Sequence, residues 1–382
     1  MPLKNKFLTL IILITSLSVS AQTDYPVFHY GEKIYAQDSQ RLSLNIYNLN
    51  YLYNTEWFSD IPLSGTQFGY QLIPELKYQV SPKFTLKGGI YLQKEFGRDK
   101  FTTIAPTFTA KYQLKHASFL IGTLEGGPNH RFIEPLYDYS LLLRERLENG
   151  IQILVNTKPY EHDLYINWRK AIHPGDPFKE EFDIGYSGRF NLLVKDKWEV
   201  RMPMQLIYSH KGGQYDNTNE PLTSLANIAL GLGVTYKPEL KWLKKIEFEN
   251  FYAGYKDVSF TKQQLFDKGN AYLSHLLFQL NDFGIDFRYW RGHDYIGPRG
   301  MALFNSISEK YPGLTAPDRQ LLIVSFIYDK EIAKNLFFNA RITPYKDFIE
   351  DITSSTGLEF SYEIYLKYVM KINLARLKND LR

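Results

Sequence analysis

Apolar and polar residues alternate without interruption over residues 358–372, near the carboxyl end of the chain. Leu358, Phe360 and Tyr362 begin the apolar set, whereas Glu359 and Glu363 belong to the mostly polar set between them. Successive side chains of a β-strand point to opposite faces, so the pattern predicts a strand with one apolar and one polar face. Soluble strands usually contain about 5–6 residues, whereas a tilted strand that crosses a bilayer needs roughly 9–11. The segment therefore favours a strand of a membrane β-barrel.

The same alternation recurs along the chain and predicts an all-β, antiparallel up-and-down transmembrane barrel of about sixteen strands. Because boundaries read from sequence err by about 2–4 residues, the count could lie between about 14 and about 18. Connections such as 125–149 and 291–318 are long and alternate with short ones such as 281–282. Bacterial barrels combine long outer loops with short periplasmic turns. In the first predicted strand, the apolar phase slips between Ile46 and Leu49, which predicts a bulge.

The first residues have the composition of a secretion signal. Lys4 and Lys6 precede an apolar run over residues 7–17, and Ala21 is the small residue before the expected cleavage. The run is shorter than the roughly 20 residues of a membrane-spanning helix, so we expect an exported protein. The predicted organisation is a signal peptide (1–21), a periplasmic N-terminal segment (22–40), a transmembrane barrel (41–372) and a polar C-terminal tail (373–382).

Composition supports the barrel and excludes several kinds of site. The chain contains 29 Tyr and 26 Phe at a mean hydropathy of −0.32, which fits alternating strands with aromatic girdles. It contains no Cys, so thiol nucleophiles and thiolate metal sites are excluded, and we expect neither a cofactor nor a metal. The formal net charge of +4 falls to +2 without Lys4 and Lys6 (4 − 2), which predicts no nucleic-acid partner.

In these features the chain resembles Gram-negative outer-membrane β-barrels of the general porin class. The features are the signal ending Val19-Ser20-Ala21, the alternating strands, the unequal connections and the two-faced last strand. The resemblance covers residues 41–372 and implies an outer-membrane location and a third outer loop that folds into the barrel. The chain departs from such barrels in residues 373–382, where a polar, basic tail replaces a terminal aromatic residue.

Charged residues of both signs recur on the predicted lumen face. The candidates for pore-lining residues are Glu75, Lys77, Lys111, Arg169, Asp183, Arg189, Glu199, Arg201, Glu247, Glu249, Asp286, Arg288 and Arg341. The candidates for a constriction in the third outer loop are His130, Arg131, Glu134, Asp138, Arg144 and Arg146. In a water-filled lumen such residues select solutes by their field. They could equally pair with one another and fill the barrel.

The leading hypothesis is a channel, not an enzyme, for passive or selective passage of small solutes. Its expected partners are outer-membrane lipid and small solutes, with other outer-membrane proteins or a second copy of the chain left open. The alternative is a barrel with a filled lumen that serves as a structural or assembly subunit of an outer-membrane complex.

A more distant alternative is an outer-membrane hydrolase. Such an enzyme needs a Ser that a nearby His activates. His116 and Ser118 have the spacing of two residues on one face of a strand, but they lie in a predicted periplasmic turn. Ser209 and His210 are adjacent, so a strand points them to opposite faces.

Overall fold

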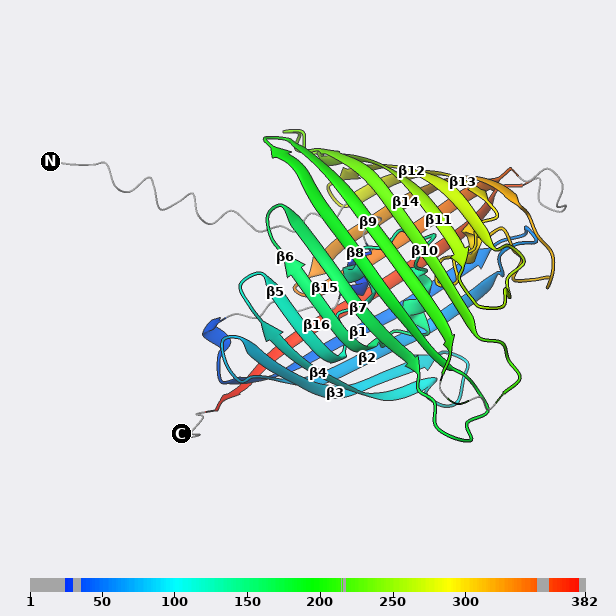
Figure 1. The fold of residues 1–382 in the computed structure, drawn as a ribbon. Coiled ribbons are helices and arrows are strands. Elements are labelled where there is room, and N and C mark those ends of the chain that lie inside the picture. Colours follow the sequence, from blue (N-terminus) through cyan, green and yellow to red (C-terminus); the bar gives the residue numbers. More distant parts are fainter. Residues whose placement is uncertain (1–24, 30–35, 214, 216–217, 349–356, 378–382) are drawn as a thin grey trace.

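The computed structural model describes residues 25–29, 36–213, 215, 218–348 and 357–377. Within them, sixteen antiparallel strands form one closed barrel in which each strand pairs with its neighbours in the chain and β1 pairs with β16 (Figure 1). The predicted fold class and the resemblance to porin-like outer-membrane barrels are confirmed. Closure satisfies the backbone hydrogen-bonding groups of every strand, which a bilayer requires because it offers no water. No helix among these residues is long and apolar enough to cross a membrane.

The strands have the following bounds: β1 (Arg41–Glu56), β2 (Gly65–Gln79), β3 (Phe84–Glu95), β4 (Thr103–Gln113), β5 (Ala117–Thr123), β6 (Asn149–Asn156), β7 (Tyr160–Lys170), β8 (Glu180–Lys195), β9 (Trp198–Gly212), β10 (Thr223–Tyr236), β11 (Leu243–Asp257), β12 (Lys268–Leu280), β13 (Phe283–His293), β14 (Asp318–Ala333), β15 (Leu336–Asp347) and β16 (Glu359–Arg376). Five short 3-10 helices complete the described elements: η1 (Pro26–Phe28), η2 (Ala36–Asp38), η3 (Gly127–His130), η4 (Tyr139–Leu143) and η5 (Ala302–Phe304).

The predicted bulge between Ile46 and Leu49 is absent from β1. The strand keeps a continuous register with β2 from Arg41 to Thr55, and its irregularity with β16 lies between Leu42 and Ser43. The apolar residues change face because the lumen itself is apolar at this depth: Leu49 is fully buried and faces inward. The shift in the apolar pattern therefore reflects a change in what the inner face of β1 contacts, and not an extra residue in the strand.

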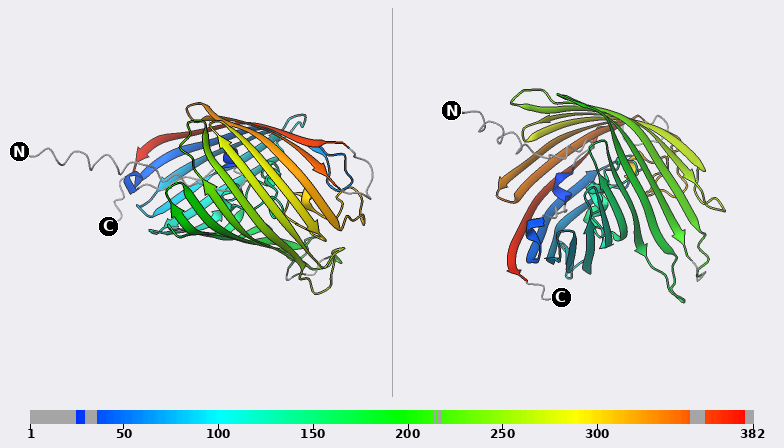
Figure 2. Two further views of the ribbon diagram at one scale, coloured as in Figure 1. Left: turned by 90° about the horizontal axis from the view of Figure 1, so that it is seen from above. Right: turned by 60° about the vertical axis from the view of Figure 1, so that its left-hand side comes forward.

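Three segments fill much of the space that the strands enclose. The third outer loop, residues 124–148, contributes η3 and η4, and the seventh outer loop, residues 294–317, contributes η5. Residues 25–29 lie beside them, where the ring of Tyr25 is 4.9 Å from that of Tyr139 and the ring of Phe28 is 5.1 Å from that of Tyr365. Two further views show these segments inside the ring of strands (Figure 2). The hydrophobic core of the molecule therefore lies within the barrel.

The closing strand extends further than the alternation alone indicated. β16 continues to Arg376, and Arg376 pairs with Arg41 at the start of β1. The first part of the predicted polar tail is therefore strand, while residues 378–382 and the predicted signal peptide lie outside the described residues.

Candidate functional site

The predicted pore-lining residues all come from the inward-facing positions of their strands. Ten of them are buried: Glu75, Lys77, Asp183, Arg189, Arg201, Glu247, Glu249, Asp286, Arg288 and Arg341. Lys111, Glu199 and Arg169 are more accessible and make ion pairs with Glu125, Lys237 and Glu181, respectively. Their role in solute passage stays a prediction.

Several of these charges pair with one another inside the barrel, and Arg201 of β9 reaches past β10 to two carboxylates of β11. The guanidinium of Arg201 lies 2.8 Å from a carboxylate oxygen of Glu247 and 3.0 Å from one of Glu249. Arg288 pairs with Asp286 at 3.3 Å and with Glu134 of the third outer loop. Buried charges of opposite sign thus compensate one another within the lumen.

One part of this network has the composition of a metal site. Ligand atoms of Glu247, Glu249 and His275 lie within 4.8 Å of one another, and all three residues are buried. Arg201 contacts both carboxylates, and His275 lies 2.7 Å from Asp286. The carboxylates therefore have cationic partners from the protein itself, so the geometry does not require a metal for charge balance.

The predicted constriction loop is anchored to the inner wall by His130. Its Nδ1 lies 2.8 Å from Asp163 and its Nε2 lies 2.5 Å from Glu148, while its ring stacks on that of Tyr165 at 3.8 Å. Both ring nitrogens of a histidine donate only in the imidazolium form, so two carboxylate partners favour the cation. The Glu148 carboxylate also accepts a hydrogen bond from Tyr137 at 2.7 Å.

The other predicted constriction residues occupy different parts of the same loop. Arg131 pairs with Glu161 on β7 at 3.0 Å. Arg146 donates to Gln71 of β2 at 3.2 Å and stacks on the ring of Tyr47. The remaining three have these contacts: Glu134 accepts from Tyr25 and pairs with Arg288, Asp138 caps η4 by accepting from Ser140, and Arg144 lines a cavity at the outer mouth.

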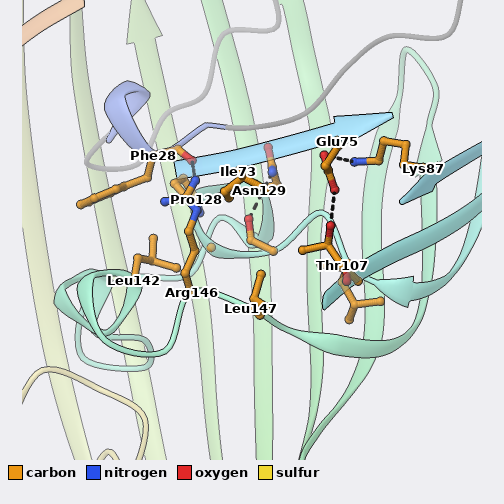
Figure 3. A pocket seen from close by; sticks show the side chains of 14 residues that line it. Phe28, Ile73, Glu75, Lys87, Thr107, Pro128, Asn129, Leu142, Arg146 and Leu147 are labelled. Carbon is orange, nitrogen blue, oxygen red and sulfur yellow. Dashed lines mark hydrogen bonds and ion pairs between the residues drawn. The ribbon is translucent and has the colours of Figure 1, made fainter. Parts of the chain in front are cut away.

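Three small cavities lie among the described lumen residues. Figure 3 shows one of about 40 Å³ beneath the third outer loop, where Glu75 contacts Lys87 and Thr107 on the wall. Two others measure about 20 and 10 Å³. Spaces of this size hold one or a few water molecules.

A larger cavity of about 430 Å³ lies at the outer mouth. The third outer loop contributes Asp138 and Arg144 to it, β1 contributes Tyr53, and the seventh outer loop contributes Arg299 and Glu309. Burial raises the pKa of the Glu309 carboxyl. An open space lined by two outer loops and β1 is thus present at the outer mouth.

A different kind of site lies on the outer surface of the wall. The imidazole Nδ1 of His210, on β9, lies 2.9 Å from the hydroxyl oxygen of Ser224, on β10. His210 and Ser224 occupy directly opposed positions of the two strands. Tyr208 donates to the same Ser224 hydroxyl at 3.0 Å. Among the described residues, this is the one hydrogen bond between a serine hydroxyl and a histidine ring.

The pair faces the membrane and not the lumen. On β9, Ile207 and Gln205 are buried inward, whereas the alternate positions that include Tyr208 and His210 are partly exposed. Ser209, the neighbour of His210 in the chain, points inward and donates to Asp183 at 2.7 Å. The prediction that Ser209 and His210 occupy opposite faces agrees with this arrangement, and the serine partner of His210 comes from the next strand.

Aromatic side chains place the pair at the outer boundary of the bilayer. The ring of Phe182 lies 5.0 Å from that of His210 and 5.3 Å from that of Trp168. At the other end of β9, exposed Trp198 stacks on Tyr236 beside a periplasmic turn. The 12 positions between Trp198 and His210 (210 − 198) span about 40 Å along a strand, or about 30 Å of bilayer at a tilt of about 45°. Two girdles separated in this way mark the two membrane interfaces.

A carboxylate lies on the same outward face as the pair. Glu180 of β8 accepts a hydrogen bond from Trp168 at 3.0 Å and is close enough to act electrostatically on His210. Glu180 is opposite Gly212 in the pairing of β8 with β9. Nε2 of His210 lies close to Gly212, so a β-carbon added to Gly212 would be only 2.3 Å from this nitrogen. Gly212 thus leaves room for the imidazole to turn Nε2 toward the strand that carries Glu180.

Apolar side chains surround the pair on its outer side. The backbone N–H of Val258 donates to the carbonyl of Ser224 at 2.8 Å, so residues 258–259 continue the pairing of β10 with β11. Alternation also continues there: Val258 and Phe260 are exposed, and Ser259 between them is buried. Phe260 has an exposure of 101%. An apolar rim therefore lies beside Ser224 on the membrane side.

The sequence did not reveal this pair, because 14 positions separate the two residues and only the strand register brings them together. His116 and Ser118, the pair whose spacing in the sequence suggested a hydrolase site, lie at the periplasmic end of the barrel. His116 lies in the periplasmic turn before β5, and Ser118 pairs with Gln113 and Leu154. No hydrogen bond joins His116 to Ser118 among the described residues.

Solved structures with a similar fold include outer membrane proteins. OprD of Pseudomonas aeruginosa superposes with a TM-score of 0.52 at 10% identity, with 90% of this chain and 98% of that chain covered. A loop-deletion mutant of OmpT, an outer membrane protein of Vibrio cholerae, gives a TM-score of 0.51 at 10% identity, with coverage of 86% and 100%. OccAB3 of Acinetobacter baumannii gives 0.50 at 11% identity, with coverage of 87% and 99%. The likeness shows a porin-like outer-membrane barrel.

Comparison with protein families points to an enzyme-type family, in addition to the porin-like fold. No curated protein matches the chain in sequence. A family model described as lipid A 3'-O-deacylase-type matches residues 34–377, which is nearly the whole barrel. Because this is a family of enzymes, the prediction that the protein is not an enzyme is wrong. The chain belongs to the lipid A 3'-O-deacylase-type family.

Proposed function

We propose that the protein hydrolyses an acyl ester of a glycolipid of the lipid A class in the outer leaflet of the outer membrane. One observation carries the proposal: a hydrogen-bonded Ser224–His210 pair faces lipid at the outer girdle. The ester bonds of membrane lipids lie at the boundary between acyl chains and headgroups, which is the depth of this girdle. Membership of the deacylase-type family supports the same class of reaction.

The geometry supports a two-step acyl transfer. Nδ1 of His210 accepts the hydroxyl proton of Ser224 while the Ser224 oxygen attacks the ester carbonyl. The bond between the carbonyl carbon and the sugar oxygen breaks, and the imidazolium returns the proton to the leaving alcohol. Water, deprotonated by the same imidazole, then attacks the acyl-serine carbonyl. The bond between this carbonyl carbon and the Ser224 oxygen breaks, the imidazolium returns the proton to Ser224, and the fatty acid leaves.

Two neighbouring groups assist this sequence of steps. Glu180 favours the imidazolium that forms in the first step, because its negative charge acts on His210. The hydroxyl of Tyr208, which is 3.0 Å from the Ser224 oxygen, is a donor for the oxyanion that forms on the attacked carbonyl. Val258 and Phe260 offer apolar surface to the acyl chain.

Hydrolysis of purified lipid A by the folded barrel in detergent micelles tests the proposal, with released fatty acid measured by mass spectrometry. Ser224→Ala and His210→Ala are each expected to reduce the rate by a factor of at least about 100. Ser209→Ala is the matched control, because Ser209 adjoins His210 but points into the lumen. Full activity in Ser224→Ala would refute the assignment.

A second candidate function is passage of small solutes, which the porin-like fold and the charged inner face favour. The third outer loop fills much of the lumen, and a cavity of about 430 Å³ lies at the outer mouth. Passage therefore requires this loop to leave the wall. Single-channel recordings in planar bilayers test the function, and the absence of current from folded protein would exclude it.

A further inference from the structure

Two lysines lie directly opposite each other on the membrane-facing side of the wall, beside the Ser224–His210 pair. Lys256 of β11 pairs in register with Lys268 of β12, and both side chains are exposed. Near the lysines, the buried residues are Tyr255 and Asp257 on β11 and Ala271 and Leu273 on β12, so the alternate positions of the two lysines face outward.

The two ammonium groups have no acidic partner among the described residues. Directly opposed residues of an antiparallel pair have β-carbons about 5 Å apart, and like charges at such positions destabilise the sheet. Two other basic residues at the outer ends of strands do have counter-ions: Lys211 pairs with Glu220 at 2.5 Å, and Arg169 pairs with Glu181 at 2.6 Å. The lysine pair thus forms a concentration of uncompensated positive charge.

The pair lies within reach of a lipid bound at Ser224. Lys256 is opposite Ala226, and Ala226 lies two positions from Ser224 on the same face of β10. A diagonal neighbour of this kind is about 7–8 Å away in an antiparallel sheet. Val258, which is opposite Ser224, adds an apolar side chain beside the nucleophile. The outward face therefore presents a nucleophile and an apolar side chain in one row of opposed residues, and the two lysines in the next row.

We propose that Lys256 and Lys268 form a binding site for the phosphate group of the lipid whose ester Ser224 attacks. This inference rests on the proposed function, because it takes the Ser224 side of the wall as the place where the lipid binds. One phosphate between two ammonium groups removes their mutual repulsion and accepts charge-assisted hydrogen bonds from both. The phosphate fixes the headgroup on β11 and β12 while the acyl ester reaches Ser224 on β10.

Binding is measured in the Ser224→Ala barrel, so that the result does not depend on hydrolysis. The probes are dihexanoyl phosphatidic acid, the uncharged dihexanoylglycerol and inorganic phosphate, each titrated calorimetrically into protein in detergent. Adding Lys256→Gln and Lys268→Gln is expected to weaken phosphatidic acid binding by at least about tenfold. Binding of dihexanoylglycerol is expected to stay unchanged.

Lys346→Gln is the matched control, because Lys346 is also on an outer strand end but donates to the Gly357 carbonyl on the β15–β16 side of the barrel. A heat-modifiability gel confirms that each variant is folded. Competition by inorganic phosphate would show that the phosphate group alone is recognised, and lack of competition would show that the acyl chains contribute; both support the lysine site. Unchanged affinity for phosphatidic acid in the double lysine variant would overturn the proposal even if Ser224 proved catalytic.

Discussion

Replacement of His130 by alanine is expected to release the third outer loop from the barrel wall. The imidazolium is fully buried between Asp163 and Glu148 and stacks on Tyr165. Its removal leaves two buried carboxylates without their shared cation, and removal of one partner of a buried ion pair costs about 3–5 kcal/mol. Tyr137 still donates to Glu148, which places the expected loss of stability near the lower end, about 3 kcal/mol.

Two measurements test this expectation. Urea unfolding in lipid vesicles gives the change in free energy, and trypsin digestion reports on Arg131, Arg144 and Arg146, which are potential cleavage sites in the loop. The His130→Ala barrel is expected to be cut faster within residues 124–148, while its strands stay protected. Single-channel current is expected to rise as well, because the loop leaves the lumen.

The control is His162→Ala. His162 also makes a side-chain hydrogen bond, to Tyr186 of β8 at 2.8 Å, but it lies on the outward side of β7, away from the face that the loop contacts. Its replacement is expected to leave loop digestion unchanged. If His130→Ala changed neither the unfolding free energy nor the digestion of the loop, the imidazolium would not be the anchor inferred from the geometry.

Two further substitutions address the lumen and the membrane face. Arg201→Ala removes the cation that contacts both Glu247 and Glu249. The free energy of unfolding measured in urea is expected to fall by about 3–5 kcal/mol. An unchanged urea midpoint would contradict a structural role for this charge cluster. Val258→Asp places a charge in the apolar rim beside Ser224. The rate of lipid A hydrolysis is expected to fall at least about tenfold, while a soluble short-chain ester is hydrolysed at the wild-type rate. Equal effects on both substrates would argue against a role of Val258 in binding the acyl chain.

Much of the fold follows from the sequence because a membrane barrel obeys one simple rule, alternation at period two. The rule fails in β1, where Leu49 and Tyr51 face inward although they are apolar. Alternation reports polarity, and here the lumen is apolar because Tyr25 and the third outer loop occupy it. Nothing local to β1 reveals that distant segments supply this lining.

The candidate active site was harder to predict for a different reason. Ser224 and His210 meet only through the register of β9 and β10, and that register depends on the length and path of the loop between them. A search for short-range spacings instead selects His116 and Ser118. Their spacing would place both side chains on one face of a strand, but they lie at a periplasmic turn, far from the outer leaflet. The face on which an inward charge lies, by contrast, depends only on the phase of its own strand, which the sequence shows; whether these charges line a path for solutes stays a prediction.

The most direct test of the proposed chemistry is covalent trapping of the nucleophile. A long-chain alkyl fluorophosphonate is incubated with the folded barrel in detergent, and the modified peptide is identified by mass spectrometry. The structure predicts one adduct on Ser224, strongly reduced in His210→Ala and unchanged in Ser209→Ala. An unmodified Ser224 in a barrel that hydrolyses lipid A would contradict the account.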